Sequence, residues 1–255
     1  MIATAAAPTM TAPAPRPFLT RALAVVRLLI ANPWISVIVP MGILSFIFAL
    51  NYVLFRILSS QAAEDGEWSA TTGGISFVYI YVLILAVTSV NQSFPLALGL
   101  GATRREFSVG TAIYFGAASL LIAATIATAA EIEIATDGWG IPFQFFSLAG
   151  VGIDSWGALF AFSLLMLALA VSIGFVTAVV YVRWKARGMY VYWIAVTVLL
   201  LGALASLVSL DDWGVIGGFI VEAQALGLAL WSLVITIPAA LIGDALLRRA
   251  VPPSA

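Results

Sequence analysis

The sequence predicts an all-α integral membrane protein with six transmembrane helices, an amphipathic interfacial helix before them, and both termini in the cytoplasm. Three observations lead to this prediction. Apolar residues make up 63% of the chain and charged residues only 9%, whereas soluble domains average about 45–50% apolar and about 25% charged. Six apolar stretches are each long enough to cross a bilayer, which takes about 20 helical residues. Basic residues gather on alternate connections between these stretches.

The chain begins with an Ala/Pro/Thr tail, residues 1–15, in which neither charge nor periodicity predicts folded structure. Residues 16–32 then show helical amphipathicity. Apolar side chains recur on one face at Phe18, Ala22, Val25 and Leu29, and polar ones lie opposite at Arg16, Thr20 and Arg27. We expect this helix to lie at the membrane surface with its arginines among the headgroups.

Six apolar stretches make up a transmembrane domain over residues 33–247, followed by a tail at 248–255. The expected spans are about 33–55, 75–98, 107–130, 156–182, 189–210 and 224–247. Asn32 and Pro33 suit the cap and first position of the first span, and Pro40 predicts a kink within it.

Charge sets the topology of these spans. Ten of the eleven basic residues fall on one side, namely Arg16, Arg21, Arg27, Arg104, Arg105, Arg183, Lys185, Arg187, Arg248 and Arg249. Only Arg56 falls on the other side, where most of the acidic residues also lie. The positive-inside rule makes the basic side cytoplasmic.

Histidine and cysteine are both absent. Their absence excludes disulfides, intramembrane proteases with a Ser/His pair and His-ligated metalloproteases, so we expect no catalytic residues and no metal site. The phosphate-binding pattern G-x-x-x-x-G-K-[ST] does not occur, so we expect no cofactor bound to this chain. No nucleic-acid partner is expected. The excess of arginine over lysine, with abundant alanine, glycine and valine, suggests a GC-rich bacterial genome.

The 99–107 turn, between the second and third spans, is the most informative polar stretch. Gly99 and Gly101 are suited to ending a helix, and Thr103 with Glu106 forms the Thr-x-x-Glu capping-box spacing at the start of the next. Arg104 and Arg105 oppose the helix dipole in that first turn. They serve either as topology signals or as contacts for a cytoplasmic partner.

The sequence Gly101-Ala-Thr-Arg-Arg-Glu-Phe107 resembles the G-x-[ST]-R-R-x-[FY] turn of ABC-2 type transporter permeases. The resemblance extends to the architecture, with an amphipathic connecting helix at 16–32 and six spans. It implies an exporter subunit in the bacterial cytoplasmic membrane that pairs with a second permease copy and with separate ABC ATPase subunits, which would bind ATP and Mg²⁺. The ATPase-coupling residues would be Thr103, Arg104, Arg105, Glu106 and Phe107.

Polar side chains within the first two spans are the second group of candidates, namely Asn51, Thr88, Asn91 and Gln92. Amides in hydrocarbon are costly, so these residues either bond between helices or line a translocation path. Asp244 is expected to pair with Arg248 one turn later. Glu131 and Glu133, at the far end of the third span, are expected to be solvated rim residues or, less favoured, a cation or proton site.

Small residues and two long connections complete the predictions. Ala170, Gly174 and Ala178 on one span, and Ala112 and Gly116 on another, permit close helix approach, most simply within the chain. The connections at 131–155 and 210–222 are expected to hold interfacial or shallow re-entrant segments.

Two other functions compete with the exporter subunit. A membrane scaffold or assembly protein would bind partners and transport nothing. A proton-driven secondary transporter would need an ionisable residue at mid-membrane, and no predicted span carries one, so this function ranks last.

Overall fold

The computed structural model describes residues 17–31, 34, 38–62, 70–148, 153, 155–209 and 225–249, which are mostly helical. The helices are α1 (Phe18–Ile30), α2 (Val39–Ala62), α3 (Ser76–Gly99), α4 (Arg104–Ala135), α5 (Trp156–Ser209) and α7 (Leu233–Arg248). Residues 225–231 are also helical and lead into α7. The predicted tail at 1–15, the 210–222 connection, and the predicted first-span start at Asn32 and Pro33 lie outside the described residues.

Five helices of the described residues are long and apolar enough to cross a membrane, which indicates a membrane protein. The predicted fourth and fifth spans both fall within α5, whose backbone bends at Lys185 with φ 55° and ψ −148°. An unbent helix with the length of α5 would be more than twice as long as the hydrocarbon core is thick, about 30 Å. The bend divides α5 into 156–184 and 186–209, and the count of six spans remains a prediction.

The predicted boundaries of the second span are close to those of α3, whereas the helix of the first span runs past its predicted end. The α-helix of α2 begins at Val39 and continues to Ala62, beyond the predicted end at residue 55. Pro40 is the second residue of α2, and residues 35–37 before it lie outside the described ones, so the kink at Pro40 stays a prediction. Pro95 is tolerated, because α3 continues past it to Gly99.

Helices α3, α4 and α7 pack around the 156–184 half of α5. A Cβ at Gly174 would lie 2.6 Å from the Leu83 carbonyl oxygen, so this glycine is what allows α5 to approach α3 closely. The small residues of the fourth span therefore pack within the chain, as predicted. Gly116 on α4 has no neighbour in the described structure within 4 Å of a Cβ, so the second small-residue row has no such role there.

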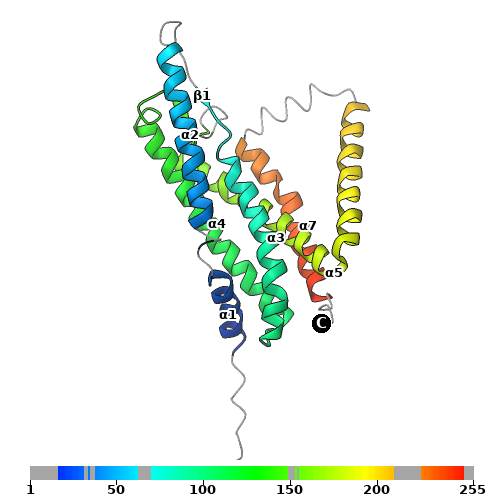
Figure 1. Cartoon of the computed structure of the whole chain (residues 1–255). Helices are drawn as coiled ribbons and strands as arrows, with labels where there is room; N and C mark the ends of the chain where they lie inside the picture. Colours follow the sequence, from blue (N-terminus) through cyan, green and yellow to red (C-terminus); the bar gives the residue numbers. More distant parts are fainter. Residues whose placement is uncertain are drawn as a thin grey trace, which may run out of the picture.

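The helix termini that carry basic residues lie at one end of the molecule. Figure 1 shows α1, the connection from α3 to α4, the bend of α5 and the last turn of α7 at the same end, while α2 finishes at the opposite end. We call the first the basic end. Its described cations are Arg21, Arg27, Arg104, Arg105, Arg183, Lys185, Arg187, Arg248 and Arg249. This arrangement agrees with the predicted grouping of charges.

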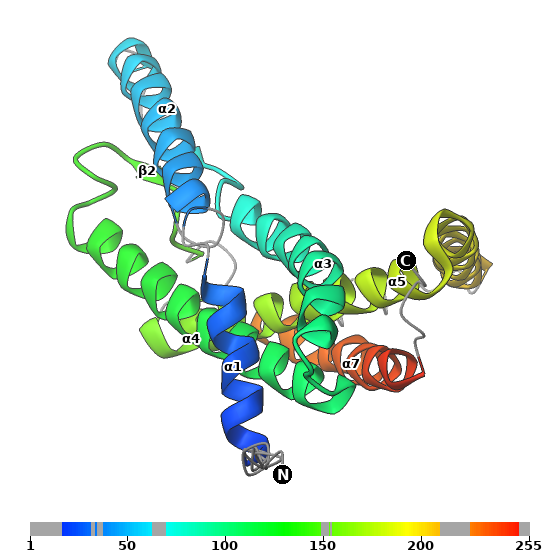
Figure 2. The ribbon, with the colours of Figure 1, turned by 60° about the horizontal axis from the view of Figure 1, so that its bottom comes forward.

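The opposite end contains the only departure from helix among the described elements. The two-residue strands β1 (Ala70–Thr71) and β2 (Phe143–Gln144) pair in parallel, which an all-α prediction does not include. Figure 2 shows β2 beside α2. The Phe48 ring of α2 lies 5.2 Å from the Trp139 ring and 5.3 Å from the Phe145 ring, measured between centroids. Aromatic packing thus joins α2 to the loop after α4.

Candidate functional site

The 99–107 turn is a tightly bonded connection between α3 and α4. Gly101 has φ 84°, a left-handed conformation that glycine adopts without a steric penalty. Its N–H donates to the Leu98 carbonyl at 2.9 Å, and the Ala102 N–H donates to the Ala97 carbonyl at 2.9 Å. This pair of bonds is a Schellman motif, which satisfies the last carbonyls of α3. The predicted helix end at Gly101 is confirmed, whereas Gly99 remains helical.

The predicted capping box is present at the start of α4. The Glu106 N–H donates to Thr103 Oγ1 at 3.3 Å, and the Thr103 N–H donates to Glu106 Oε2 at 2.7 Å. Glu106 is only 4% exposed, and its other oxygen, Oε1, lies 3.2 Å from Nε of Arg21 on α1. The carboxylate of Glu106 therefore both caps α4 and fixes α1 to it, and the burial of this charge is offset by a cation.

The two adjacent arginines of the turn also contact other helices. Arg104 Nη1 donates to the Arg248 carbonyl at the end of α7, at 2.8 Å. The guanidinium of the exposed Arg105 lies 5.3 Å from the centre of the Phe18 ring on α1, in cation–π geometry. Neither contact was predicted, and both give these arginines a role inside the chain.

A second bonded group joins α4 to α7. Ser108 Oγ donates to Asp244 Oδ1 at 2.7 Å, and Asp244 Oδ2 lies 2.7 Å from Arg248 Nη2. The predicted Asp244–Arg248 pair is thus confirmed. Together with the Arg104 bond, these contacts connect α1, α3 and α7 to the first turns of α4.

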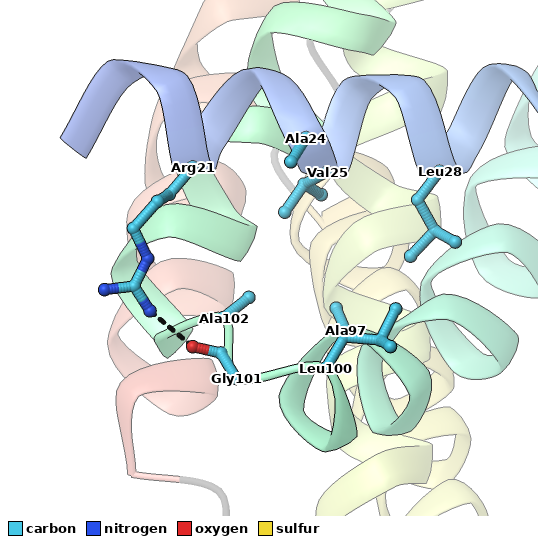
Figure 3. Close-up of a pocket in the computed structure, with 8 residues that line it drawn as sticks. All are labelled: Arg21, Ala24, Val25, Leu28, Ala97, Leu100, Gly101 and Ala102. Atoms are coloured by element: carbon cyan, nitrogen blue, oxygen red, sulfur yellow. Dashed lines mark hydrogen bonds between the residues drawn. The ribbon is translucent and has the colours of Figure 1, made fainter. Parts of the chain in front are cut away.

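A cavity of about 320 Å³ lies between α1 and the end of α3. Figure 3 shows Ala24, Val25 and Leu28 pointing from α1 towards Ala97 and Leu100, with the Arg21 side chain at one edge. Arg21 also donates to the Gly101 carbonyl there. The walls are mainly apolar, and Arg21 holds α1 to the turn at one edge of the cavity.

Helix α1 differs from its prediction in what covers its apolar face. Ala22, Val25 and Leu29 are buried, because they pack against the chain itself rather than against headgroups. A Cβ at Gly110 of α4 would lie 2.6 Å from the Ala22 carbonyl oxygen, which shows how closely the helices approach. A second apolar row remains exposed instead, formed by Leu19, Leu23 and Ile30. That row, rather than the predicted one, is available to a membrane surface.

The four predicted path residues do not share one lining. Thr88 and Gln92 are exposed on α3, and Thr88 Oγ1 donates to the Ile84 carbonyl of its own helix. Asn51 Nδ2 likewise donates to Ile47 within α2, at 2.8 Å. Asn91 is half-buried, and its Oδ1 has no hydrogen-bond partner among the described residues. None of the four lines the cavity beside α1.

Glu133 is not the solvated rim residue that the sequence predicts. It is 1% exposed, near the end of α4. Its carboxylate accepts hydrogen bonds from the Trp139 indole at 3.0 Å and from the backbone N–H groups of Phe145, Phe146 and Ser147 at 3.0, 3.1 and 2.8 Å. Glu131, two residues earlier, is exposed as predicted. Glu133 therefore organises the loop that follows α4.

Sequence reasoning missed Arg21, Ser108 and Glu133. A signal existed for Arg21, since Glu106 and Asp244 are the only acidic residues among many cations at the basic end, so each was bound to have a basic partner nearby. No comparable signal marks Glu133, because its donors are mostly backbone groups 12 to 14 residues further along the chain.

Comparison of the chain with protein-family models, with curated proteins and with solved structures finds no match in any of the three.

Proposed function

We propose that the chain is the membrane-spanning permease subunit of an ATP-driven ABC exporter in a bacterial cytoplasmic membrane. The observation that supports this is the fastening of three helices to the segment that resembles a coupling turn. Arg21 and Arg105 contacts tie α1 to it, Arg104 ties α7, and the chain itself continues into α3. If a partner displaced this turn, the contacts would transmit the movement to α1, α3 and α7 together.

In this proposal the chain contributes no chemistry of its own. Separate ATPase subunits bind ATP and Mg²⁺, and two permease copies form the translocation path between them. The residues of the turn have different roles. Thr103 and Glu106 hold the start of α4, the buried Phe107 packs against the Phe94 ring at 5.2 Å between centroids, and exposed Arg105 is available to a partner.

The decisive experiment removes the turn's charges and measures association with the ATPase. The chain is co-expressed with an ABC ATPase encoded beside it, and the complex is captured from membranes solubilised in detergent. Arg104→Gln with Arg105→Gln should reduce ATPase capture at least tenfold, which corresponds to about 1.4 kcal/mol, and abolish export. Arg27→Gln, which removes an exposed cation of α1, is the matched control and should capture normally.

Separating the two arginines sharpens the test. Arg104 also bonds to the last turn of α7, so its loss alters the chain itself, whereas the exposed Arg105 makes a weaker cation–π contact with the Phe18 ring. Arg105→Gln alone should therefore weaken capture while lowering the thermal stability of the permease less than Arg104→Gln does. If the double variant is stable and still captures the ATPase at the parental level, the docking role is wrong.

A non-transporting scaffold is the second candidate, and two observations favour it. Both arginines already have contacts within the chain, and the four predicted path residues are dispersed. A scaffold requires neither ATPase capture nor substrate movement. Absence of any ATPase gene beside this one, with no ATP-dependent transport in reconstituted vesicles, would favour this second function.

A further inference from the structure

The bend of α5 concentrates positive charge that nothing in the described structure neutralises. Helix α5 contains no acidic residue, yet it carries Arg183, Lys185 and Arg187 within five positions. The two salt bridges of the described residues involve other cations. Arg183 instead lies 4.7 Å from the centre of the Trp184 ring, and Lys185 lies 5.6 Å from that of Tyr181. Aromatic faces hold these cations in place without cancelling their charge.

The surroundings of the bend are apolar and aromatic. Beyond Lys185 the helix exposes large side chains on all sides, with Val191 69%, Val198 64% and Leu201 59% exposed. Figure 1 shows this half of α5 standing apart from the other helices. A helix that is apolar all round is stable only when something apolar surrounds it. Exposed aromatic residues gather near the bend, namely Tyr181, Trp184, Tyr190 and Trp193.

We propose that the α5 bend, residues 181–193, is a binding site for the headgroup of an anionic phospholipid. Arg183, Lys185 and Arg187 would contact the lipid phosphate, and the aromatic side chains would lie at headgroup depth, where tryptophan and tyrosine are enriched in membrane proteins. A lipid is the occupant that the surroundings favour over an acidic protein segment, because the helix beyond the cations offers acyl chains a continuous apolar surface. This inference is independent of the proposed transport function.

The expected preference follows from the number of cations. A basic residue close to an anionic membrane surface contributes about 1 kcal/mol, so each is worth about a fivefold preference for an anionic over a zwitterionic lipid. Three such residues set an upper limit of about a hundredfold. Because the attraction is screened at distances beyond the Debye length, which is about 10 Å at 0.1 M salt, the preference should fall as salt is added.

The absence of native cysteine provides a direct test. One cysteine is introduced at the exposed Ala186 of the full chain and labelled with a donor fluorophore, and the chain is reconstituted in phosphatidylcholine vesicles. Trace phosphatidylglycerol or phosphatidylcholine carries an acceptor on its acyl chain. We expect at least fivefold enrichment of phosphatidylglycerol near the probe in 50 mM salt and clearly less in 500 mM salt. Equal transfer to both lipids would overturn the proposal and leave an acidic protein as the alternative occupant.

Two variants locate the preference. Arg183→Gln, Lys185→Gln and Arg187→Gln together should bring the enrichment close to one, whereas Arg27→Gln with Arg249→Gln, which removes cations of the same end away from the bend, should leave it unchanged. Arg183→Lys with Arg187→Lys keeps the charge and should keep the enrichment, which guards against a fault in insertion. Enrichment that survives the triple change, or that is lost equally in the control pair, would place the lipid elsewhere.

Discussion

The two ends of α4 each bury a glutamate, and the two are stabilised by different means. Glu106, in the first turn, lies where the helix dipole favours an anion, and it has Arg21 as a cationic partner. Glu133, near the last turn, lies where the same dipole opposes an anion, and it has no salt-bridge partner among the described residues. It instead accepts four N–H donors from the loop that follows.

The two glutamates show that a buried carboxylate can be satisfied by its own helical turn or only by a segment further along the chain. Glu106 is satisfied by its own turn and then recruits α1, so removing it should loosen a contact between helices. Glu133 is satisfied only when residues 139–147 fold back over it, so the whole loop depends on one carboxylate. A buried donor that loses its acceptor costs about 1–3 kcal/mol, which makes the second arrangement the more vulnerable one.

Glu133→Ala should therefore have the largest effect of any single substitution at the two ends of α4. It leaves three backbone N–H groups and the Trp139 indole without their acceptor, so the free energy of unfolding should fall by at least about 3 kcal/mol. Denaturant titration in detergent micelles measures this. Glu131→Ala is the matched control, since Glu131 is an exposed glutamate on the same turn, and its effect should stay within about 0.5 kcal/mol. Equal effects of the two changes would contradict the role of Glu133.

At the other end, Arg21→Gln and Glu106→Gln should each destabilise the chain, and the two changes should not be additive. The double variant is expected to recover a coupling energy of about 0.5–3 kcal/mol, because it removes both charges of one pair. Arg27→Gln combined with Glu106→Gln serves as the control cycle. Additive effects in both cycles would mean that the 3.2 Å contact between Arg21 and Glu106 contributes nothing.

Thr103→Ala tests the capping half of the Glu106 end. The loss of the Oγ1 acceptor for the Glu106 N–H should cost about 0.5–2 kcal/mol. Thr125→Ala removes the same hydroxyl from an exposed position in the middle of α4 and should cost less. A larger loss for Thr125→Ala would show that the cap is unimportant. Hydrogen exchange at residues 103–107 would show fraying confined to this turn.

Trp139→Phe is the smallest perturbation of the Glu133 end. It removes one of four donors while keeping an aromatic ring against Phe48, so the expected cost is about 0.5–1.5 kcal/mol. Trp193→Phe, at an exposed position on α5, is the control and should be nearly neutral. A cost equal to that of Glu133→Ala would mean that the indole donor, rather than the three backbone N–H groups, accounts for the stabilising role of Glu133.

The sequence predicts features whose signals are local. The end of α3 at Gly101, the Thr103–Glu106 box and the Asp244–Arg248 pair all depend on residues within one helical turn of each other. The helix of the first span continues to Ala62, beyond its predicted end, because an apolar run carries no mark of where its helix stops. Arg21 and Glu133 escape prediction because their partners depend on how distant segments pack.

The resemblance to ABC-2 permeases depends on the same local turn. The structure adds a contact within the chain that the sequence pattern does not indicate. Arg104 bonds to a carbonyl of α7, so a sequence motif read as a docking signal also has an internal role. The four polar residues predicted to line a path could not be placed from sequence, because helical periodicity alone does not tell which faces of α2 and α3 meet their neighbours.

The backbone at Lys185 lies in a region of conformational space that is almost restricted to glycine, at an exposed position, and it joins two parts with different dependence on the rest of the chain. The C-terminal part contains α7, whose Gly243 packs closely against Phe175 in the first half of α5. A break in the polypeptide after Lys185 should therefore leave both pieces associated. Co-expressed fragments 1–185 and 186–255 are expected to purify together, so the bend is a natural place to divide this protein into two complementing polypeptides.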